Sequence, residues 1–333
     1  MKESILEVKN LHFAYDEHHT VLDGISLSVF AGERIAILGS NGAGKSTFFL
    51  NLNGVLTPAE GEISYRGTKI TRKTLKKLRQ HIGIVFQDAD NQIIASSVLA
   101  EVSFGPMNLK LPRSEVEERV NTALNYMNIS QFKDRPPHYL SGGEKKRVSI
   151  ADIIAMKSEI IIFDEPTAMI DPEGRKEVLK AIYDLNRLKH ITIIYITHFL
   201  DEVSKADYLY VMKQGAITLE GSPETLFKMP DQLTENNLEL PFEISFIAEL
   251  RKKGLNIPKE IYTKKQLLEF FKYLQQEEGF LFSEKKVDPI KEPLFCQELR
   301  HSQSLGIRCH TSQTNSSLSS WCQKQNTLFH YAL

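Results

Sequence analysis

Short runs of apolar residues recur along the first two thirds of this chain, and polar or glycine-rich stretches separate them. Residues 34–38, 82–86, 160–163 and 191–197 are such runs. Each is short and apolar enough to form a strand that is buried on both faces of a parallel sheet. Helical patterns lie between these runs, and alternation of this kind is typical of an α/β fold. We therefore predict a mostly parallel core sheet with helices on both faces.

The pattern becomes helical between residues 95 and 140, where acidic and apolar residues interleave in 115–120 and 123–127. This spacing gives amphipathic helices, whose apolar sides pack against one another or against a sheet. The strand pattern resumes at residue 160 and ends near 221–223. A helical segment is therefore expected to interrupt the catalytic sheet.

A glycine-rich segment follows the apolar run 34–38 and matches the pattern G-x-x-x-x-G-K-[ST] at every fixed position. Glycines let the backbone wrap closely around phosphate oxygens, and consecutive N–H groups converge on the anion. Lys45 is expected to reach the β- and γ-phosphates of a nucleotide, and Ser46 to bind Mg²⁺. The predicted nucleotide-binding residues of this segment are Gly39, Ser40, Asn41, Gly42, Ala43, Gly44, Lys45, Ser46 and Thr47.

Two acidic residues, Asp164 and Glu165, come directly after the apolar run 160–163. In open α/β sheets, ligands bind outside the carboxyl ends of the strands, so these acids are expected to belong to a site. We assign Asp164 to the Mg²⁺ shell and Glu165 to the attacking water, as the general base or the group that polarises it. The same acids can also cap the helix that follows, which is compatible with catalysis.

The pentapeptide Leu140-Ser141-Gly142-Gly143-Glu144 reads locally as a capping box, in which Ser141 and Glu144 each bind a free backbone N–H at a helix start. Gly142 and Gly143 leave the backbone amides of that helix N-terminus bare, and an anion binds well there. The anion that we expect is the nucleotide phosphate of another subunit.

With the phosphate loop and the paired acids, this pentapeptide resembles the signature of ATP-binding-cassette (ABC) ATPases. The resemblance implies a P-loop NTPase cassette with a mostly parallel core sheet, an antiparallel β subdomain and a helical subdomain at about 95–140. The ATPase domain would span 4–228, and a small C-terminal helical domain would occupy 229–285. The last part, 286–333, is atypical, since the chain has no Asp or Glu from residue 299 onward, and it is expected to be a disordered tail or a sequence foreign to the family.

The same resemblance gives roles to four further residues. Gln87 matches the Q-loop glutamine, which senses Mg²⁺ and the γ-phosphate, and His198 matches the switch histidine that contacts the γ-phosphate. Asp171 resembles the D-loop aspartate that couples the two sites of a dimer, and Tyr15 resembles the aromatic residue that stacks on adenine. Without the resemblance, these would be a strand-end histidine, a turn aspartate, a packed tyrosine and an uninformative glutamine.

Three stretches resemble one branch of the family, the energy-coupling-factor (ECF) ATPases, which power uptake of vitamins and of cobalt or nickel ions. They are the Q-loop at 85–92, the segment 140–156, and Leu240-Pro241 with the helical pattern that follows. Asp88-Ala89 replaces the asparagine-proline that usually follows the Q-loop glutamine. The resemblance covers roughly residues 4–280.

This branch implies an ATP- and Mg²⁺-dependent ATPase that drives transport through separate integral membrane subunits. Two cassettes would face head to tail, with each ATP held between one phosphate loop and the partner's residues 141–144. The expected partners are therefore a second ABC ATPase subunit, identical or related, and the membrane subunits that couple and bind the substrate. The alternatives are an ABC ATPase of another importer class, one that acts on nucleic acid or ribosomes, and an inactive binding module.

Composition narrows these alternatives. The chain has 41 basic and 42 acidic residues, so its overall charge gives no reason to expect nucleic acid as a partner. No run approaches the roughly 18 apolar residues that span a bilayer. Acids near the start, where a signal peptide is apolar, and the lack of cysteine before Cys296 indicate a cytoplasmic protein. We expect it to be peripheral on the cytoplasmic face of the cell membrane.

Overall fold

The computed structural model describes residues 4–16 and 19–281 of the 333-residue chain. The chain divides after Phe246 into two compact units. The first unit contains every residue to which the sequence assigns a role. The tail predicted at 286–333 lies outside the described residues.

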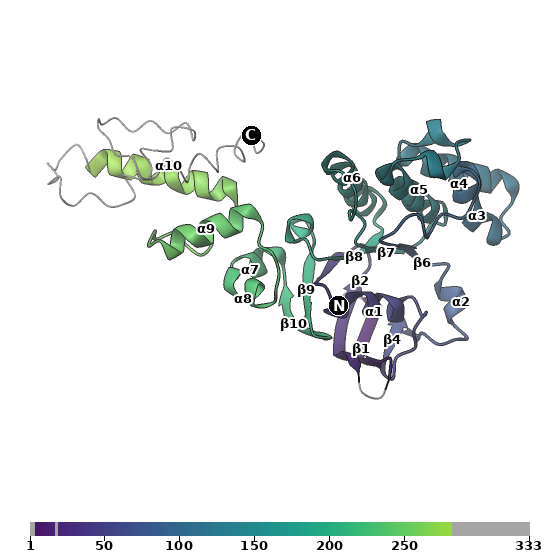
Figure 1. The fold of residues 1–333 in the computed structure, drawn as a ribbon, viewed down its shortest axis with the longest axis horizontal. Helices are drawn as coiled ribbons and strands as arrows, with labels where there is room; N and C mark the ends of the chain where they lie inside the picture. The colour runs from purple at the N-terminus through teal and green to yellow at the C-terminus, as the bar shows by residue number, and fades with distance from the viewer. Residues whose placement is uncertain (1–3, 17–18, 282–333) are drawn as a thin grey trace. The chain divides into compact units, whose positions relative to one another are not determined.

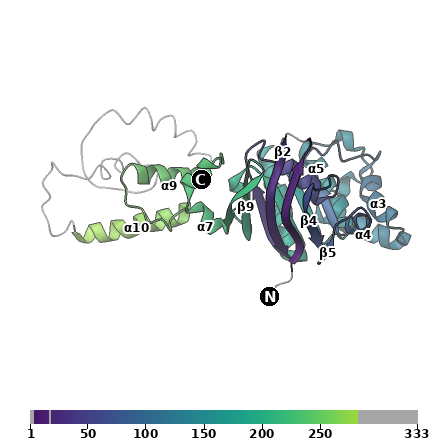
Figure 2. The same ribbon diagram turned by 90° about the horizontal axis from the view of Figure 1, so that it is seen from below.

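The described part of the first unit contains two sheets. One is antiparallel with the order β2-β1-β4-β5, and Figure 2 shows β2, β1 and β4 side by side. Its strands are β1 (Ser4–Ala14), β2 (Thr20–Phe30), β4 (Glu60–Tyr65) and β5 (Thr68–Lys69). The presence of this sheet confirms the predicted antiparallel β subdomain.

The other sheet has six strands in the order β10-β9-β3-β8-β7-β6 and is parallel from β9 to β6. Its strands are β3 (Arg34–Leu38), β6 (Ile82–Val85), β7 (Ile160–Asp164), β8 (Thr192–Thr197), β9 (Tyr208–Lys213) and β10 (Ala216–Gly221). The near-continuous apolar residues of β3, β7 and β8 are buried, as strands covered on both faces require. The mostly parallel core sheet is therefore confirmed.

The register of the central strands determines where the polar loops lie. Leu38 at the end of β3 pairs with Thr197 at the end of β8, and Asp164 at the end of β7 pairs with Ile196. Because these strands are parallel and end at the same level, the segments that follow them begin at one edge of the sheet. This edge is where the phosphate loop, the acidic pair and His198 emerge.

One hydrophobic core joins the two sheets through α1 (Lys45–Leu52), which follows the phosphate loop. Phe48, Phe49 and Leu52 are almost fully buried in this core, together with apolar residues of β1, β2, β3, β7 and β8. The helix is therefore anchored at its apolar side, so the phosphate loop at its N-terminus has a fixed support.

The helical part of the first unit is built around α5 (Gly142–Ala155), which contacts α3 (Val98–Asn108) and α4 (Arg113–Tyr126). These three helices lie together in Figure 1. The predicted range of 95–140 covers α3 and α4, and the signature helix α5 adds to the same group. The short α2 (Leu75–Leu78) and the long α6 (Pro172–Lys189) complete the helices that precede β8.

The first unit extends further along the chain than the boundary at 228 that the sequence predicts. Two short helices, α7 (Pro223–Phe227) and α8 (Pro230–Glu235), follow β10. Lys213 Nζ of β9 donates to Glu235 O at 2.6 Å, and Thr218 Oγ1 of β10 donates to Asn236 Oδ1 at 2.5 Å. These bonds hold the end of α8 and the residue after it to the β9–β10 hairpin, and the division between the units falls inside α9 (Phe242–Lys252).

The second unit contains the end of α9 and α10 (Lys264–Leu281). Arg251 joins its segments, since its guanidinium donates to Ile257 O at 3.0 Å and to Ile261 O at 2.8 Å. Within residues 4–16 and 19–281, we find no helix with the length and apolar character needed to cross a membrane.

Candidate functional site

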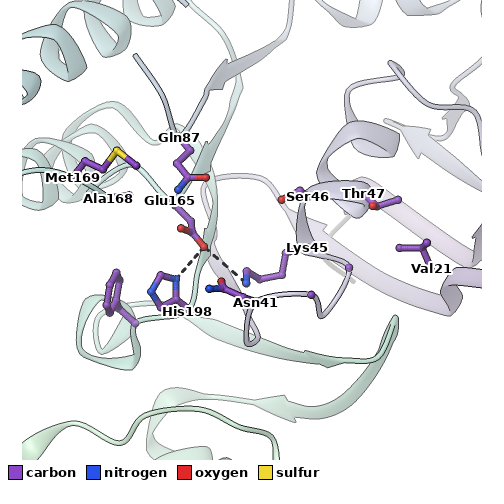
Figure 3. Close-up of a pocket in the computed structure, with 13 residues that line it drawn as sticks. Val21, Asn41, Lys45, Ser46, Thr47, Gln87, Glu165, Ala168, Met169 and His198 are labelled. Carbon is purple, nitrogen blue, oxygen red and sulfur yellow. Dashed lines mark hydrogen bonds and ion pairs between the residues drawn. The ribbon is translucent and has the colours of Figure 1, made fainter. Parts of the chain in front are cut away.

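A pocket of about 520 Å³ lies at the sheet edge where the polar loops emerge (Figure 3). Nine of the predicted site residues line it: Asn41, Gly42, Gly44, Lys45, Ser46, Thr47, Gln87, Glu165 and His198. Four residues that the sequence did not indicate line it as well: Val21, Ala168, Met169 and Phe199. These four are apolar and belong to ordinary strand or loop patterns, so no chemical signal marked them.

Gly39 and Gly44 show why the phosphate loop needs glycine. A Cβ on Gly39 would lie 2.6 Å from the backbone oxygen of Met212 in β9, so any side chain there would clash with backbone. Gly44 has a φ of 98°, which L-residues with a side chain rarely adopt. With this curvature, the ammonium of Lys45 turns back to donate to Gly39 O at 2.7 Å and to Ser40 O at 3.0 Å. Burial lowers the pKa of Lys45, although Glu165 and Asp164 oppose this change.

The Glu165 carboxylate lies between the imidazole of His198 and the ammonium of Lys45. Its Oε1 atom is 3.0 Å from His198 Nδ1 and 3.9 Å from Lys45 Nζ, and only 12% of the side chain is exposed. The backbone of Glu165 has a φ of 41°, a left-handed conformation that costs a residue with a side chain about 1–3 kcal/mol. A bond from its N–H to Ile196 O at 2.9 Å holds this conformation. The carboxylate is thus directed into the pocket from a restrained backbone.

Asp164 precedes Glu165 at the end of β7 and has a different electrostatic environment. Burial, helped by the charge of Glu165, raises the pKa of Asp164 to about 6, while Lys45 and Lys146 oppose the rise. A bound cation would favour the charged carboxylate. Asp164, Ser46 and Gln87 offer carboxylate, hydroxyl and amide oxygens, which are the hard ligands that Mg²⁺ prefers. The donor set therefore fits Mg²⁺, with Ser46 and Gln87 on the pocket wall.

Gln87 is held through its backbone by a lysine from the signature helix. Lys146 of α5 is 2% exposed, and its ammonium donates to Phe86 O at 2.6 Å and to Gln87 O at 2.7 Å. Burial lowers the pKa of Lys146 to about 8, against the opposing charges of Asp88 and Asp164. No signal in the sequence marked this link, although Lys146 comes only two residues after the signature.

The replacement of asparagine-proline by Asp88-Ala89 has a local explanation. The Asp88 carboxylate accepts the backbone N–H of Asp90 at 2.9 Å and the Asn91 side-chain amide at 2.8 Å. A short acidic side chain that binds the backbone two residues ahead stabilises a turn. The turn after Gln87 is therefore kept without the proline.

The signature segment forms the predicted capping box. Ser141 Oγ accepts the Glu144 N–H at 3.3 Å, and Glu144 Oε2 accepts the Ser141 N–H at 2.7 Å. Within the described part of the chain, Ser141, Gly142, Gly143 and Glu144 are not among the residues that line the pocket. The segment lies beside the loop after Glu165, since Cβ positions on Gly142 and Gly143 fall 3.7 Å from Met169 O and 3.5 Å from Ile170 Cγ2.

Asp171 belongs to that same loop and caps α6. Its Oδ1 atom accepts the N–H groups of Glu173 at 3.1 Å and Gly174 at 3.0 Å. These backbone bonds lower the pKa of the Asp171 carboxyl. The predicted coupling residue thus has a clear capping function, and it lies two residues after the exposed Met169.

Tyr15 lies just beyond the end of β1 and is 61% exposed. Its hydroxyl is 3.3 Å from Thr47 Oγ1, and its ring packs edge-on against Phe13 with a centroid distance of 5.0 Å. It is not among the residues that line the pocket, but Thr47, its partner, is. An exposed aromatic ring tethered beside the phosphate loop can stack on a planar ligand.

Known proteins share both the sequence and the fold. The profile of the ABC transporter family matches residues 22–168. The energy-coupling factor transporter ATP-binding protein EcfA of Methanocaldococcus jannaschii is 46% identical, and the match covers 77% of this chain and 92% of that protein. The structure of cbiO1 from Clostridium perfringens, part of the ABC transporter complex cbiONQ, is 42% identical with a TM-score of 0.66, covering 74% of this chain and all of that one. A dimeric ATP-binding cassette in a post-hydrolysis state, bound to ADP and phosphate, is 26% identical with a TM-score of 0.59, covering 66% of this chain and 98% of that one.

Proposed function

Because the chain belongs to the ABC transporter ATP-binding family and to its energy-coupling factor group, we propose that its ATPase activity drives uptake of a vitamin or a transition-metal ion through separate membrane subunits. The observation that carries this proposal is the convergence of Lys45, Glu165 and His198 in one pocket. An inactive binding module would have no need for a strained acidic residue directed at a phosphate loop.

We infer a separate task for each of the polar residues in the pocket. The phosphate loop amides and Lys45 bind the phosphates, and the ammonium exchanges its bonds with Gly39 O and Ser40 O for phosphate oxygens. Glu165 orients the attacking water and accepts its proton. His198, 3.0 Å from that carboxylate, holds it in position and reaches toward the γ-phosphate.

Ser46, Gln87 and Asp164 would hold the Mg²⁺ that accompanies the nucleotide. When bound, this cation supplies positive charge that offsets the charge of the phosphate oxygens. The raised pKa of Asp164 supports this role, since a buried carboxylate without a cation beside it is costly to ionise. Gln87 would report occupancy of this position to the segment that follows it.

The signature segment serves a second subunit. Gly142 and Gly143 lie at a helix N-terminus that does not line the chain's own pocket in the described structure, and such a terminus is suited to a phosphate. A two-fold pair of cassettes would therefore complete each site with the partner's residues 141–144. Asp171 lies next to this segment, where it would sense the partner. The assembly would lie on the cytoplasmic face of the cell membrane, bound to integral membrane subunits.

Replacing Glu165 by Gln tests the chemistry. We expect ATP binding to persist and hydrolysis to fall by roughly 10²-fold or more, because the amide cannot accept the proton of water. The variant should also accumulate as an ATP-bound dimer. Glu220→Gln, an exposed strand position, is the matched control and should leave hydrolysis unchanged. Undiminished hydrolysis by Glu165→Gln would exclude Glu165 as the base.

Stimulation of hydrolysis tests the transport function. Co-expressed membrane subunits that purify with the chain should raise its ATPase rate, whereas DNA or ribosomes should not. The opposite pattern would favour an ABC ATPase that acts on nucleic acid or translation. Uptake of labelled vitamins and of cobalt or nickel ions into vesicles that contain the complex would identify the cargo.

A further inference from the structure

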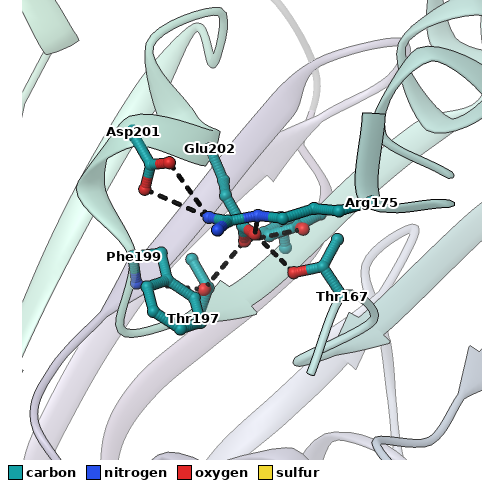
Figure 4. Close-up of polar contacts among 7 residues, drawn as sticks. Thr167, Arg175, Thr197, Phe199, Asp201 and Glu202 are labelled. Carbon is teal, nitrogen blue, oxygen red and sulfur yellow. Dashed lines mark hydrogen bonds and ion pairs between the residues drawn. The ribbon is translucent and has the colours of Figure 1, made fainter. Parts of the chain in front are cut away.

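The buried carboxylate of Glu202 connects the segments that carry the reactive groups of the pocket (Figure 4). The Glu202 side chain has no exposed surface. It accepts hydrogen bonds from Arg175 Nε at 2.8 Å, from Tyr195 Oη at 2.9 Å and from Thr197 Oγ1 at 3.0 Å. The hydroxyl of Thr167 donates to it as well. Two carboxylate oxygens thus have four donors, so the charge is fully satisfied.

The donors come from three different places around the site. Thr167 lies two residues after Glu165, in the loop that leads to Asp171. Thr197 directly precedes His198 at the end of β8. Arg175 lies in the first turns of α6, the helix that Asp171 caps. Glu202 itself belongs to the short helix Leu200–Val203 that follows the switch histidine.

Arg175 adds a second set of contacts to this network. Its guanidinium bonds the exposed Asp201 at 3.0 Å and lies 4.7 Å from the ring centroid of Phe199, a pocket-lining residue. The ring of Phe199 is in turn 3.9 Å from that of His198. Arg175 therefore contacts both the buried carboxylate and the aromatic wall beside the histidine.

A buried ion pair contributes little to stability compared with apolar residues of the same volume. The four hydrogen bonds to the Glu202 carboxylate instead specify one geometry, because each donor must keep its position for the buried charge to remain paired. Here the four positions fix the two ends of the Glu165–His198 contact relative to the start of α6.

We propose that Glu202 is a positioning residue that couples the Glu165–His198 pair to Asp171 and its helix. A displacement of α6, caused by a partner subunit at Asp171, reaches Thr167 and Thr197 through Arg175 and Glu202. The rate at which each chain hydrolyses ATP thereby depends on its contact with the partner subunit. This inference rests on the proposed function, and it adds a residue that does not touch the nucleotide.

Glu202→Gln in the full-length chain is the test, because it keeps the size of the side chain and removes its charge. We expect the kcat for ATP to fall about tenfold or more, since a misplacement of the reacting groups by a fraction of an ångström has effects of this size. The Kd for ATP should change by less than about twofold, and the Hill coefficient in ATP should fall toward that of independent sites. Asp201→Asn is the matched control, since it removes only the charge of the exposed partner of Arg175 and leaves all four bonds to Glu202 in place, so its kcat and Hill coefficient should equal those of the original protein.

A merely structural role predicts a different result. Glu202→Gln would then lower the melting temperature, but the folded protein, assayed well below that temperature, would keep its kcat and its Hill coefficient; this outcome overturns the proposal. If Glu202→Gln does not fold, Thr167→Val and Arg175→Lys decide the question, because each removes or weakens one donor and leaves the carboxylate bonded to the others. Unchanged kcat and cooperativity in both would likewise overturn it.

The same assay separates this inference from the proposed function. The original protein and Glu165→Gln are measured in parallel with the variants. Absence of ATP hydrolysis by the original protein would count against the proposed function. Normal hydrolysis by the original protein, together with normal kinetics of the Glu202 and Thr167 variants, would count against the coupling role alone.

Discussion

Gly143 is the position at which a role toward a partner subunit can be separated from a role in the fold. It is the second residue of α5, and a Cβ there would lie 3.5 Å from Ile170 Cγ2 and 3.8 Å from the Cα of Gly174. These are ordinary van der Waals distances, so an added Cβ fits without a shift of the backbone. An aspartate in the first turn also interacts favourably with the helix dipole, by about 0.3–1 kcal/mol. Because Gly143 is buried, a carboxylate there has a desolvation cost that the dipole offsets only in part, so Gly143→Asp should lower the stability of the chain modestly and leave it folded.

Gly143→Asp is expected to change the free energy of dimer closure much more than the free energy of unfolding. If the partner's nucleotide lies against this helix N-terminus, the new carboxylate faces its phosphates. Two like charges at roughly 5 Å in an effective dielectric of about 20 repel by ~3 kcal/mol. This energy corresponds to about a hundredfold change in an equilibrium constant. We expect ATP-driven dimerisation and hydrolysis to fall by about that factor, while the chain's own phosphate loop still binds ATP.

Three measurements check this prediction: thermal unfolding, binding of a fluorescent ATP analogue, and dimerisation by gel filtration in the Glu165→Gln background. Gly143→Ala is the control for size, because it adds a Cβ without a charge and should retain more dimer than Gly143→Asp. The reasoning is refuted if Gly143→Asp hydrolyses ATP at the normal rate. Loss of ATP binding by the monomer, with stability unchanged, would also contradict the assignment to the partner's site.

Two further predictions concern the pH dependence of stability and the binding of adenine. Burial and the charge of Glu101 raise the pKa of Asp152 from 3.8 to about 7. Between these two pH values the folded protein holds a proton that the unfolded chain releases. The free energy of unfolding should therefore fall as pH rises from about 4 to 7, by on the order of 3 kcal/mol after allowance for the partial exposure of Asp152. Asp152→Asn should flatten this slope in urea unfolding. Tyr15→Ala should weaken ATP binding about tenfold through loss of stacking. It should leave the melting temperature almost unchanged, because Tyr15 is 61% exposed. Tyr15→Phe keeps the aromatic ring and should bind ATP nearly as well as the original protein.

The sequence alone determined the motifs that lie within single short segments of the chain. The phosphate loop, the acidic pair at the end of β7 and the capping box at Ser141 each lie within one short segment, so their residue types and spacing suffice to predict their backbone form. The apolar runs likewise predicted the buried strands and the α/β fold, which the structure and its relatives confirm. The roles of Tyr15, Asp171 and the signature residues remain predictions from the family resemblance.

Contacts between distant segments were decided only by the tertiary structure. The requirement for glycine at position 39 comes from Met212, and the hold on Gln87 comes from Lys146. The convergence of Lys45, Glu165 and His198 depends on β3 lying beside β8, and β8 beside β7, with strand ends in register. Apolar periodicity shows that a strand is buried but not which strand is its neighbour. The buried Glu202 network follows from that same sheet order, since it joins residues whose sequence separation carries no local signal.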